Sequence, residues 1–344
     1  MHIKTKKLII ASVIVALLTM IAIFWIVARS AVADLADTSS DSDAGEEIEP
    51  TFLDEALESD LPVIFSIHME AKSARECGGV NTSCKTDEEF VEMMDVVERM
   101  IDIYNETGLK GTFEMHIQWI QRLPKTDQGR RLIQAMIDGG HEPALHHHGM
   151  TQSDWDGYSD EAGASDSDEY LGSMSDYLEI VHQFEDDWGV ELTTTEGTGL
   201  KTDSQEEWIY RTSDDQNNSE AYTISDPDGV CPVGRPVWTL ITLPNQPRSA
   251  QGYTSIGHTH FGTKNAACTE NIGAQLLERI NEIIDEGYDS NDVINFVFHP
   301  MDYGTDADNM DAHDAFYRSL SEIDELYGMT VQQYMCERVD ICYE

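Results

Sequence analysis

Histidines and acidic residues gather at the ends of several apolar segments of this sequence. Nine of the twelve histidines lie at or just beyond such an end, counting His141 at the start of one segment. The side chains that could bind a metal ion or move protons are His68, Glu70, Glu114, His116, His146, His147, His148, Glu196, His258, His260 and His299. Imidazole and carboxylate groups that converge on one point suit zinc or a similar divalent ion. Histidines scattered through a core or over a surface would not favour one end of successive segments.

The two-residue spacing within these groups indicates which side chains can act together. Successive residues of a β-strand point to opposite faces of the sheet. His146 and His148 therefore share a face, while His147 points away from them. The same alternation places His68 and Glu70 on one face of the first segment.

The elements that must position these residues alternate between strand-like and helical patterns. Short β-branched and aromatic runs indicate strands, and apolar residues at helical spacing indicate helices. Strands are expected at 63–67, 110–117, 142–147, 191–195, 237–243, 253–256 and 293–298, and helices at 86–107, 127–138, 167–188, 270–286 and 311–327. The polar stretch 200–235 is expected to be a long excursion. Such alternation predicts a mostly parallel α/β sheet, open or closed as a barrel, whose reactive groups meet where the strands end.

One segment resembles a known family. Gly140-His141-Glu142-Pro143-Ala144-Leu145-His146 is similar to the Gly-His-Glu-Ile-Gly-Asn-His segment of the polysaccharide deacetylases, the nodulation-deacetylase superfamily. The strand at 108–113 and the last strand, which ends at His299, resemble family strands in the same order. The resemblance covers roughly residues 62–335. It implies a distorted (β/α)7-type barrel and metal-dependent hydrolysis of an acetamido group on a carbohydrate.

The chain departs from the family pattern at three motifs. His68 and Met69 stand where the family has an Asp-Asp pair that supplies a base and a metal ligand. Met150 occupies the position of the second metal histidine of the family's His-Ser/Thr-x-x-His motif. Glu196 stands in a Thr-Glu-Gly sequence where the family has Arg-x-Pro-Tyr. The resemblance therefore implies a divergent member of the superfamily.

The expected chemistry is assembled from the residues that are present. By the resemblance, His146 corresponds to the first metal histidine and His299 to the late general acid. A divalent ion, zinc before others, held by Glu70, His146 and His148 would lower the pKa of a bound water. His68 could then take the proton of that water, and His299 could protonate the departing amine. Further candidates for the pocket are Glu114, His116, Glu196, His258 and His260.

Two other classes of function stay open. The chain could be a catalytically inactive relative that binds glycan at the cell surface, because the Asp pair is lost. It could also be another metallohydrolase, such as a phosphoesterase, that uses several His-x-His pairs. Metal content separates these classes, since a binding protein need hold no ion and a phosphoesterase commonly holds two.

The N-terminal region predicts export. Residues 8–28 form an apolar stretch of 21 residues, long enough to cross the hydrocarbon core as a helix, with lysines before it and acids after it. We interpret 1–33 as a signal anchor, or as a signal peptide cleaved after Ala33, and 34–60 as an acidic flexible linker. The domain at 61–344 would then lie outside the cytoplasmic membrane, either attached by the helix or secreted. Its expected partner is a carbohydrate or cell-envelope glycan.

Charge restricts the possible partners further. The whole chain has a formal net charge of −44, and all 65 acidic residues follow residue 33. Such a surface repels nucleic acid and anionic lipid, and its composition favours a saline habitat, where salt screens the self-repulsion. The oligomeric state is left open.

Cysteine spacing predicts disulfides. Six cysteines in an exported chain are more often bridged than free. The expected pairs are Cys77 with Cys84, Cys231 with Cys268, and Cys336 with Cys342.

The apolar stretch generates the first testable prediction. A retained helix at 8–28 should keep the protein in the membrane fraction through carbonate or high-salt washing, because its apolar burial does not depend on charge. Fractionation followed by N-terminal sequencing checks this. Soluble protein that begins at Asp34 would show that the segment is a cleaved signal peptide.

Overall fold

The computed structural model describes most of the chain that follows the acidic stretch. The described residues are 60–70, 87–152, 155–196, 203, 205, 208–213, 221–222, 226, 229–231, 241–242, 248–250, 253–257, 259–260, 265–304 and 306–342. The apolar stretch 8–28, nearly all of the expected linker, the Cys77–Cys84 pair and His258 lie outside them. Within the described part, no helix is long and apolar enough to cross a membrane.

The elements alternate between strand and helix, as the sequence predicts. The strands are β1 (Leu61–Met69), β2 (Gly111–His116), β3 (Glu142–His146), β4 (Thr194–Glu196), β5 (Tyr210–Ser213), β6 (Ala221–Tyr222), β7 (Ile241–Thr242), β8 (Arg248–Ala250), β9 (Tyr253–Gly257), β10 (Thr259–His260), β11 (Ile294–Phe298) and β12 (Leu326–Met329). The helices are α3 (Asp87–Thr107), α4 (Ile117–Arg122), α5 (Asp127–Asp138), α6 (Met174–Trp188), α7 (Ala266–Glu286), α8 (Pro300–Tyr303), α9 (Ala307–Ser321) and α10 (Val331–Glu337), with 3-10 turns at Leu123–Lys125 and Ala164–Asp166.

The main sheet is parallel along almost its whole width. Its strands follow the order β10-β11-β1-β2-β3-β4-β5-β9-β8, and only the β8–β9 pair is antiparallel. A single residue separates β9 from β10 in the sequence, yet β9 pairs with β5 and β10 pairs with β11. β9 and β10 therefore pair with strands at opposite ends of the order β11-β1-β2-β3-β4-β5. This curled parallel sheet fits the (β/α) barrel that the sequence predicts.

Several boundaries differ from the predicted ones for identifiable reasons. The helix expected from 167 begins only at Met174, because the side chain of Ser173 caps it in a capping box with Asp176. The helix expected to reach 327 ends at Ser321, and the chain then forms β12, which pairs with the first half of β1. The stretch 200–235, expected to be an excursion, contributes β5 to the parallel sheet. The helix α5 has the expected bounds.

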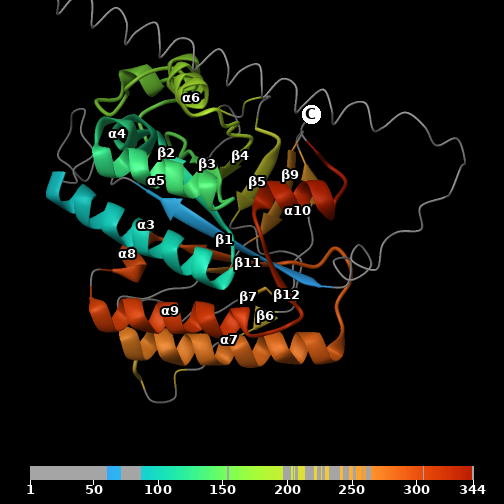
Figure 1. Ribbon diagram of the computed structural model, residues 1–344. Helices are drawn as coiled ribbons and strands as arrows, with labels where there is room; N and C mark the ends of the chain where they lie inside the picture. Colours follow the sequence, from blue (N-terminus) through green and yellow to red (C-terminus); the bar gives the residue numbers. More distant parts are fainter. Residues whose placement is uncertain are drawn as a thin grey trace, which may run out of the picture. The chain divides into compact units, whose positions relative to one another are not determined.

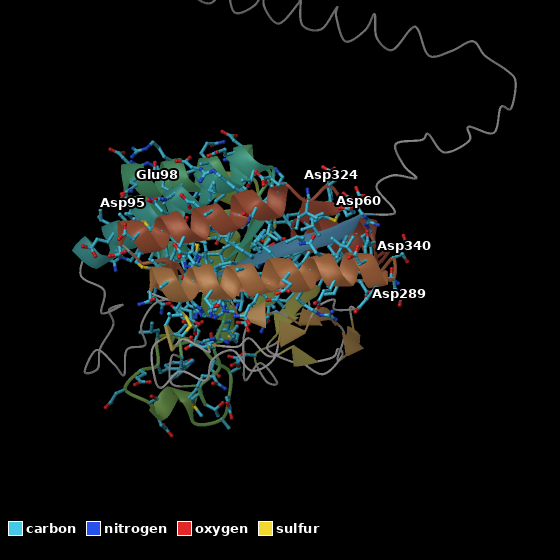
Figure 2. The ribbon with its side chains drawn as sticks, turned by 90° about the horizontal axis from the view of Figure 1, so that it is seen from below. Asp60, Asp95, Glu98, Asp289, Asp324 and Asp340 are labelled. Carbon is cyan, nitrogen blue, oxygen red and sulfur yellow. A yellow bond between two sulfur atoms is a disulfide. The ribbon has the colours of Figure 1, made fainter. Side chains whose placement is uncertain are left out.

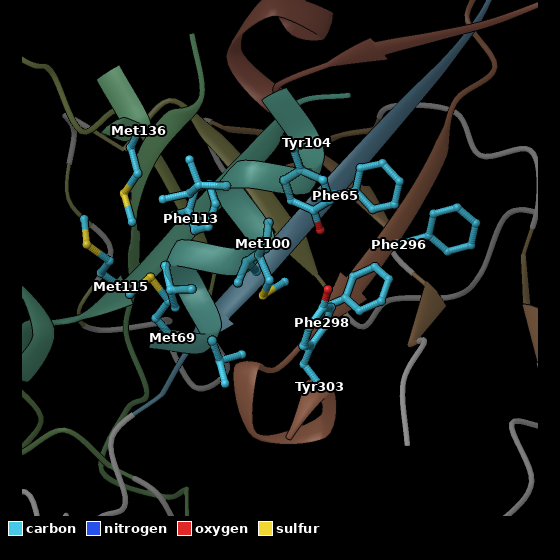
Figure 3. Close-up of a cluster of buried hydrophobic side chains, with 14 of the residues drawn as sticks. Phe65, Met69, Met100, Tyr104, Phe113, Met115, Met136, Phe296, Phe298 and Tyr303 are labelled. Carbon is cyan, nitrogen blue, oxygen red and sulfur yellow. The ribbon is translucent and has the colours of Figure 1, made fainter. Parts of the chain in front are cut away.

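Helices cover the outer face of the sheet around a large aromatic core. Figure 1 shows α7 and α9 side by side, with α3 next to α9 and α5 beyond α3, in agreement with their contacts. Beneath them the ring of Phe65 stacks on Tyr104 of α3 at 5.2 Å and on Phe296 of β11 at 5.6 Å (Figure 3). Replacing a buried phenylalanine by alanine typically costs ~3–5 kcal/mol. This core fixes β1 against β11, and both strands end in candidate site residues.

Residues of the Gly140-His141-Glu142 segment link the starts of β2, β3 and β4. The backbone N–H of Gly111 donates to Nδ1 of His141 at 3.2 Å, which joins β2 to β3. The buried carboxylate of Glu142 accepts hydrogen bonds from Thr112, from Thr194 and from the backbone N–H of Gln332 in α10. Burial raises the pKa of Glu142, and these donors oppose that shift. The segment that most resembles the deacetylases is therefore structural at this end of the sheet.

Disulfides and acidic side chains shape the exterior. Cys231–Cys268 and Cys336–Cys342 are bonded, as the spacing predicts, and the first bond ties Cys231 to α7. Figure 2 labels acidic side chains that project from the outer elements, among them Asp95 and Glu98 of α3, Asp289 and Asp324, all four of them exposed. Exposed carboxylates of this kind are expected from a chain with a net charge of −44.

The buried imidazole of His141 generates a pH prediction. Burial and the charge of Lys110 lower its pKa to about 4, below the usual value of about 6.5 that it regains on unfolding. The unfolded chain therefore binds a proton that the folded chain refuses, and stability is lost as pH falls from about 6.5 towards 4.

We expect His141→Gln to remove this part of the acid sensitivity. Between pH 6.5 and pH 5 the wild type should lose about 1–2 kcal/mol more unfolding free energy than the variant. Urea unfolding of both proteins at fixed salt measures the difference. Equal losses would mean that His141 does not titrate in this way.

Candidate metal centre

The candidate residues meet at the carboxyl ends of the parallel strands. Strand register places His68 beside Glu114, and places His146 between His116 and Glu196. Since neighbours in register point to the same face of a sheet, each of these two rows faces the interior of the curl. The sheet thus brings together side chains from four strands that are far apart in the sequence.

Three buried imidazoles form one group. The Nε2 atoms of His146 and His148 lie 2.9 Å apart, and the ring of His116 lies 4.7 Å from that of His146 and 5.0 Å from that of His148. One ligand atom from each of the three lies within 4.8 Å of the others. Burial and the neighbouring His146 and His148 lower the pKa of His116 well below its usual value. A neutral imidazole is the form that binds a metal.

A carboxylate fixes the orientation of His146. Oε2 of Glu196 lies 3.0 Å from Nδ1 of His146, so a proton held between these atoms leaves Nε2 as the atom that faces His148. Burial lowers the pKa of His146, but Glu196 and Glu70 outweigh burial and raise it well above its usual value. Glu196 and Glu70 therefore favour a positive charge at His146. A histidine that binds metal through one nitrogen and a carboxylate through the other has the same arrangement.

His68 belongs to a second pair. Its Nε2 lies 2.9 Å from Oε2 of the fully buried Glu114, whose Oε1 accepts a 2.7 Å hydrogen bond from Thr212 of β5. Burial and the charge of Glu196 raise the pKa of Glu114 well above its usual range. One ligand atom each from His68, Glu114 and His146 also lies within 4.8 Å of the others.

Glu70 lies between two histidines at the open side of the cluster. Its Oε1 is 3.5 Å from Nε2 of His146 and 3.3 Å from Nε2 of His299, which directly follows β11. Burial raises the pKa of Glu70, but hydrogen bonds from His146 and His299 outweigh burial, so this pKa lies well below its usual value. Glu70 and His299 are less buried than the other members of the cluster.

His147 points away from the cluster, as strand alternation predicts. Its Nδ1 lies 2.6 Å from Asp156, and its Nε2 lies 3.5 Å from Asp203, and all three side chains are buried. Burial lowers the pKa of His147, yet the two aspartates outweigh burial and raise it to about 9. Ser159 also donates to Asp203 at 2.8 Å. His147 thus ties the chain after β3 to the chain after β4.

The structure rearranges the expected ligand set. His146 reaches both Glu70 and His148, but these two do not form a single group with it. His116, expected only as a pocket candidate, joins His146 and His148 instead. The backbone of His260 lies in β10, while its side chain, like the whole of His258, is outside the described residues. Sequence reasoning also missed Thr212, Asp156 and Asp203, because polar residues in irregular segments carry no periodic signal.

The cluster predicts which substitutions remove a metal ion. His146→Ala or His148→Ala should abolish retention of zinc, because a three-ligand site rarely survives the loss of one ligand. His147→Gln should retain zinc but lower the unfolding free energy by about 3–5 kcal/mol, since it leaves buried aspartates without their partner. Elemental analysis and urea unfolding of the purified variants measure both effects. Equal zinc content in the wild type and His146→Ala would contradict this assignment.

Comparison with known proteins places the fold. No protein-family model matches the chain, and no curated protein matches it by sequence. A solved structure described as a probable polysaccharide deacetylase from Pseudomonas aeruginosa PAO1 is similar, with a TM-score of 0.51 and 13% identity, over 87% of this chain and 97% of that one. A putative polysaccharide deacetylase from Mycobacterium smegmatis has a TM-score of 0.47 and 13% identity, over 88% and 96%. The Puue allantoinase has a TM-score of 0.48 and 12% identity, over 86% and 94%. The chain therefore shares the fold of the probable polysaccharide deacetylase, which is the fold that the resemblance at Gly140–His146 implies.

Proposed function

We propose that this protein is a metal-dependent hydrolase that acts outside the cytoplasmic membrane and removes acetyl groups from an N-acetylated carbohydrate. The observation that carries the proposal is the convergence of His116, His146 and His148 beside two carboxylate–imidazole pairs. The deacetylase-like fold supports the proposal independently, because in such barrels the reactive groups stand at this end of the strands. The apolar stretch at 8–28 and the disulfides support the location.

The buried imidazoles fit a divalent ion. His116, His146 and His148 would hold it, with Glu70 and Glu196 supplying negative charge around it. Nitrogen ligands of this type suit zinc, and three protein ligands leave a position for water or substrate. When bound, such an ion supplies electrostatic polarisation of the acyl group and of the attacking water.

His68 is placed to act as the general base. Its contact with Glu114 orients the ring and stabilises the imidazolium that forms when His68 takes a proton from water. The oxygen of that water then bonds to the acyl carbon. Thr212 holds the other oxygen of Glu114, so the pair is fixed from a strand on the far side of the curl.

His299 is placed to act as the general acid. Glu70 lies 3.3 Å from its Nε2 and favours the protonated ring, which can donate to the nitrogen as the carbon–nitrogen bond breaks. The products are acetate and a free amine. His68 and His299 rings lie 5.1 Å apart between centroids, so proton acceptance and donation occur at one small site.

A neutral acetamido substrate suits this protein better than an anionic one. The net charge of −44 would repel a phosphate ester, and only bound ions could offset that repulsion. The phosphoesterase alternative therefore ranks below deacetylation. An inactive glycan-binding protein remains the alternative that would use the fold without the proton-transfer groups.

Acetate release tests the proposal. Full-length protein loaded with one equivalent of zinc should hydrolyse oligomers of N-acetylglucosamine, and His68→Gln should lower kcat by about 10²–10⁴ while zinc stays bound, as expected for loss of a general base. His182→Gln, at an exposed position on α6, is the matched control and should retain full activity.

The competing functions predict other results. Folded protein holding one equivalent of zinc that binds the oligomers without releasing acetate would contradict the hydrolase proposal in favour of a binding protein. Cleavage of a phosphate ester in place of the acetamide would favour the other metallohydrolase.

A further inference from the structure

We propose that the cluster holds a second divalent ion, bound by His68, Glu70 and His299, and that this ion inhibits hydrolysis. The inhibition rests on the proposed function, whereas the site itself rests only on the geometry of these three residues.

The three residues present a compact donor set. One ligand atom from each lies within 4.8 Å of the other two. Glu70 Oε1 is 3.3 Å from His299 Nε2, and the rings of His68 and His299 stand nearly perpendicular, with centroids 5.1 Å apart. Two imidazoles and one carboxylate form a ligand combination that zinc accepts readily.

The backbone fixes this arrangement in advance. His68 and Glu70 are two residues apart at the end of β1, so they share a face. His299 follows β11, the parallel neighbour of β1, with Ile67 in register with Phe298. Oε2 of Glu114 lies 2.9 Å from Nε2 of His68, and a carboxylate orients many metal-binding histidines through such a contact.

This group shares no residue with the three buried imidazoles. His116, His146 and His148 are buried, whereas Glu70 and His299 are partly exposed. Oε1 of Glu70 lies 3.5 Å from Nε2 of His146, so the two groups are adjacent. Two ions can therefore be held at once, with the second exchanging faster because its ligands are nearer to solvent.

Binding at the second group removes the proton-transfer groups. An imidazole nitrogen that coordinates an ion cannot accept or donate a proton at that atom. Hydrolysis should thus rise as the buried group fills and fall as His68 and His299 become ligands. Magnesium should not produce the fall, because it prefers oxygen ligands in an octahedral arrangement.

Zinc titration of metal-free, full-length protein tests the site. Calorimetry at fixed salt should show two bound ions in the wild type and one in each of two variants. His148→Ala should lose the tighter ion and His299→Gln the weaker one. His182→Gln, which removes an exposed histidine of α6, serves as the matched control and should bind two ions. Wild-type protein that binds one ion, or His299→Gln that still binds two, would overturn the site.

Activity during the same titration tests the inhibition. Acetate release should peak near one zinc per protein and fall at least tenfold as the second ion binds, and it should recover when a chelator removes that ion. Activity that rises with the second ion would overturn inhibition and favour a two-ion hydrolase. Two bound ions with no acetate release at any zinc level would overturn the proposed function and the inhibition with it, while the second site would stand.

Discussion

Burial of carboxylates beside imidazoles is the interaction on which this structure depends. Glu114 and Glu196 are buried inside the sheet, where an isolated charge would be costly, and each lies about 3 Å from a histidine ring nitrogen. Removing either partner would leave the other buried and unpaired in a low-dielectric interior. An apolar core of the same volume would be easier to form. The polar cluster therefore indicates a site that is kept for its chemistry, and a divalent ion would balance its negative charge.

The rest of the barrel serves to bring these pairs into contact. Parallel register puts His68 next to Glu114 and His146 next to Glu196, so each pair spans two neighbouring strands. The aromatic core around Phe65 fixes β1 against β11 and so sets the distance from Glu70 to His299. Towards the opposite end of the strands, Glu142 joins β2 and β4 to α10. The strand starts thus hold the fold together while the strand ends carry the site, and one fold can carry different sites in this way.

Sequence reasoning predicted the layers of this fold better than its details. Period-two and helical patterns are local, so α5 was placed with its correct bounds and the histidines were assigned to strand ends. The same reasoning identified His147 as the residue that points away. It missed β5 and its Thr212, because a four-residue strand in a polar stretch has no pattern that stands out. It named His116 only as a pocket candidate, because spacing along one strand does not reveal which side chain of a neighbouring strand lies beside His146 and His148.

X-ray absorption of the protein loaded with one equivalent of zinc tests the central claim most directly. The account predicts a nitrogen-rich first shell, with the multiple-scattering pattern of at least three imidazoles at about 2.0–2.1 Å. The same spectrum of His116→Ala should show fewer imidazoles. A first shell made only of oxygen would contradict the account, because it would place the zinc on the acidic surface and not among the buried histidines.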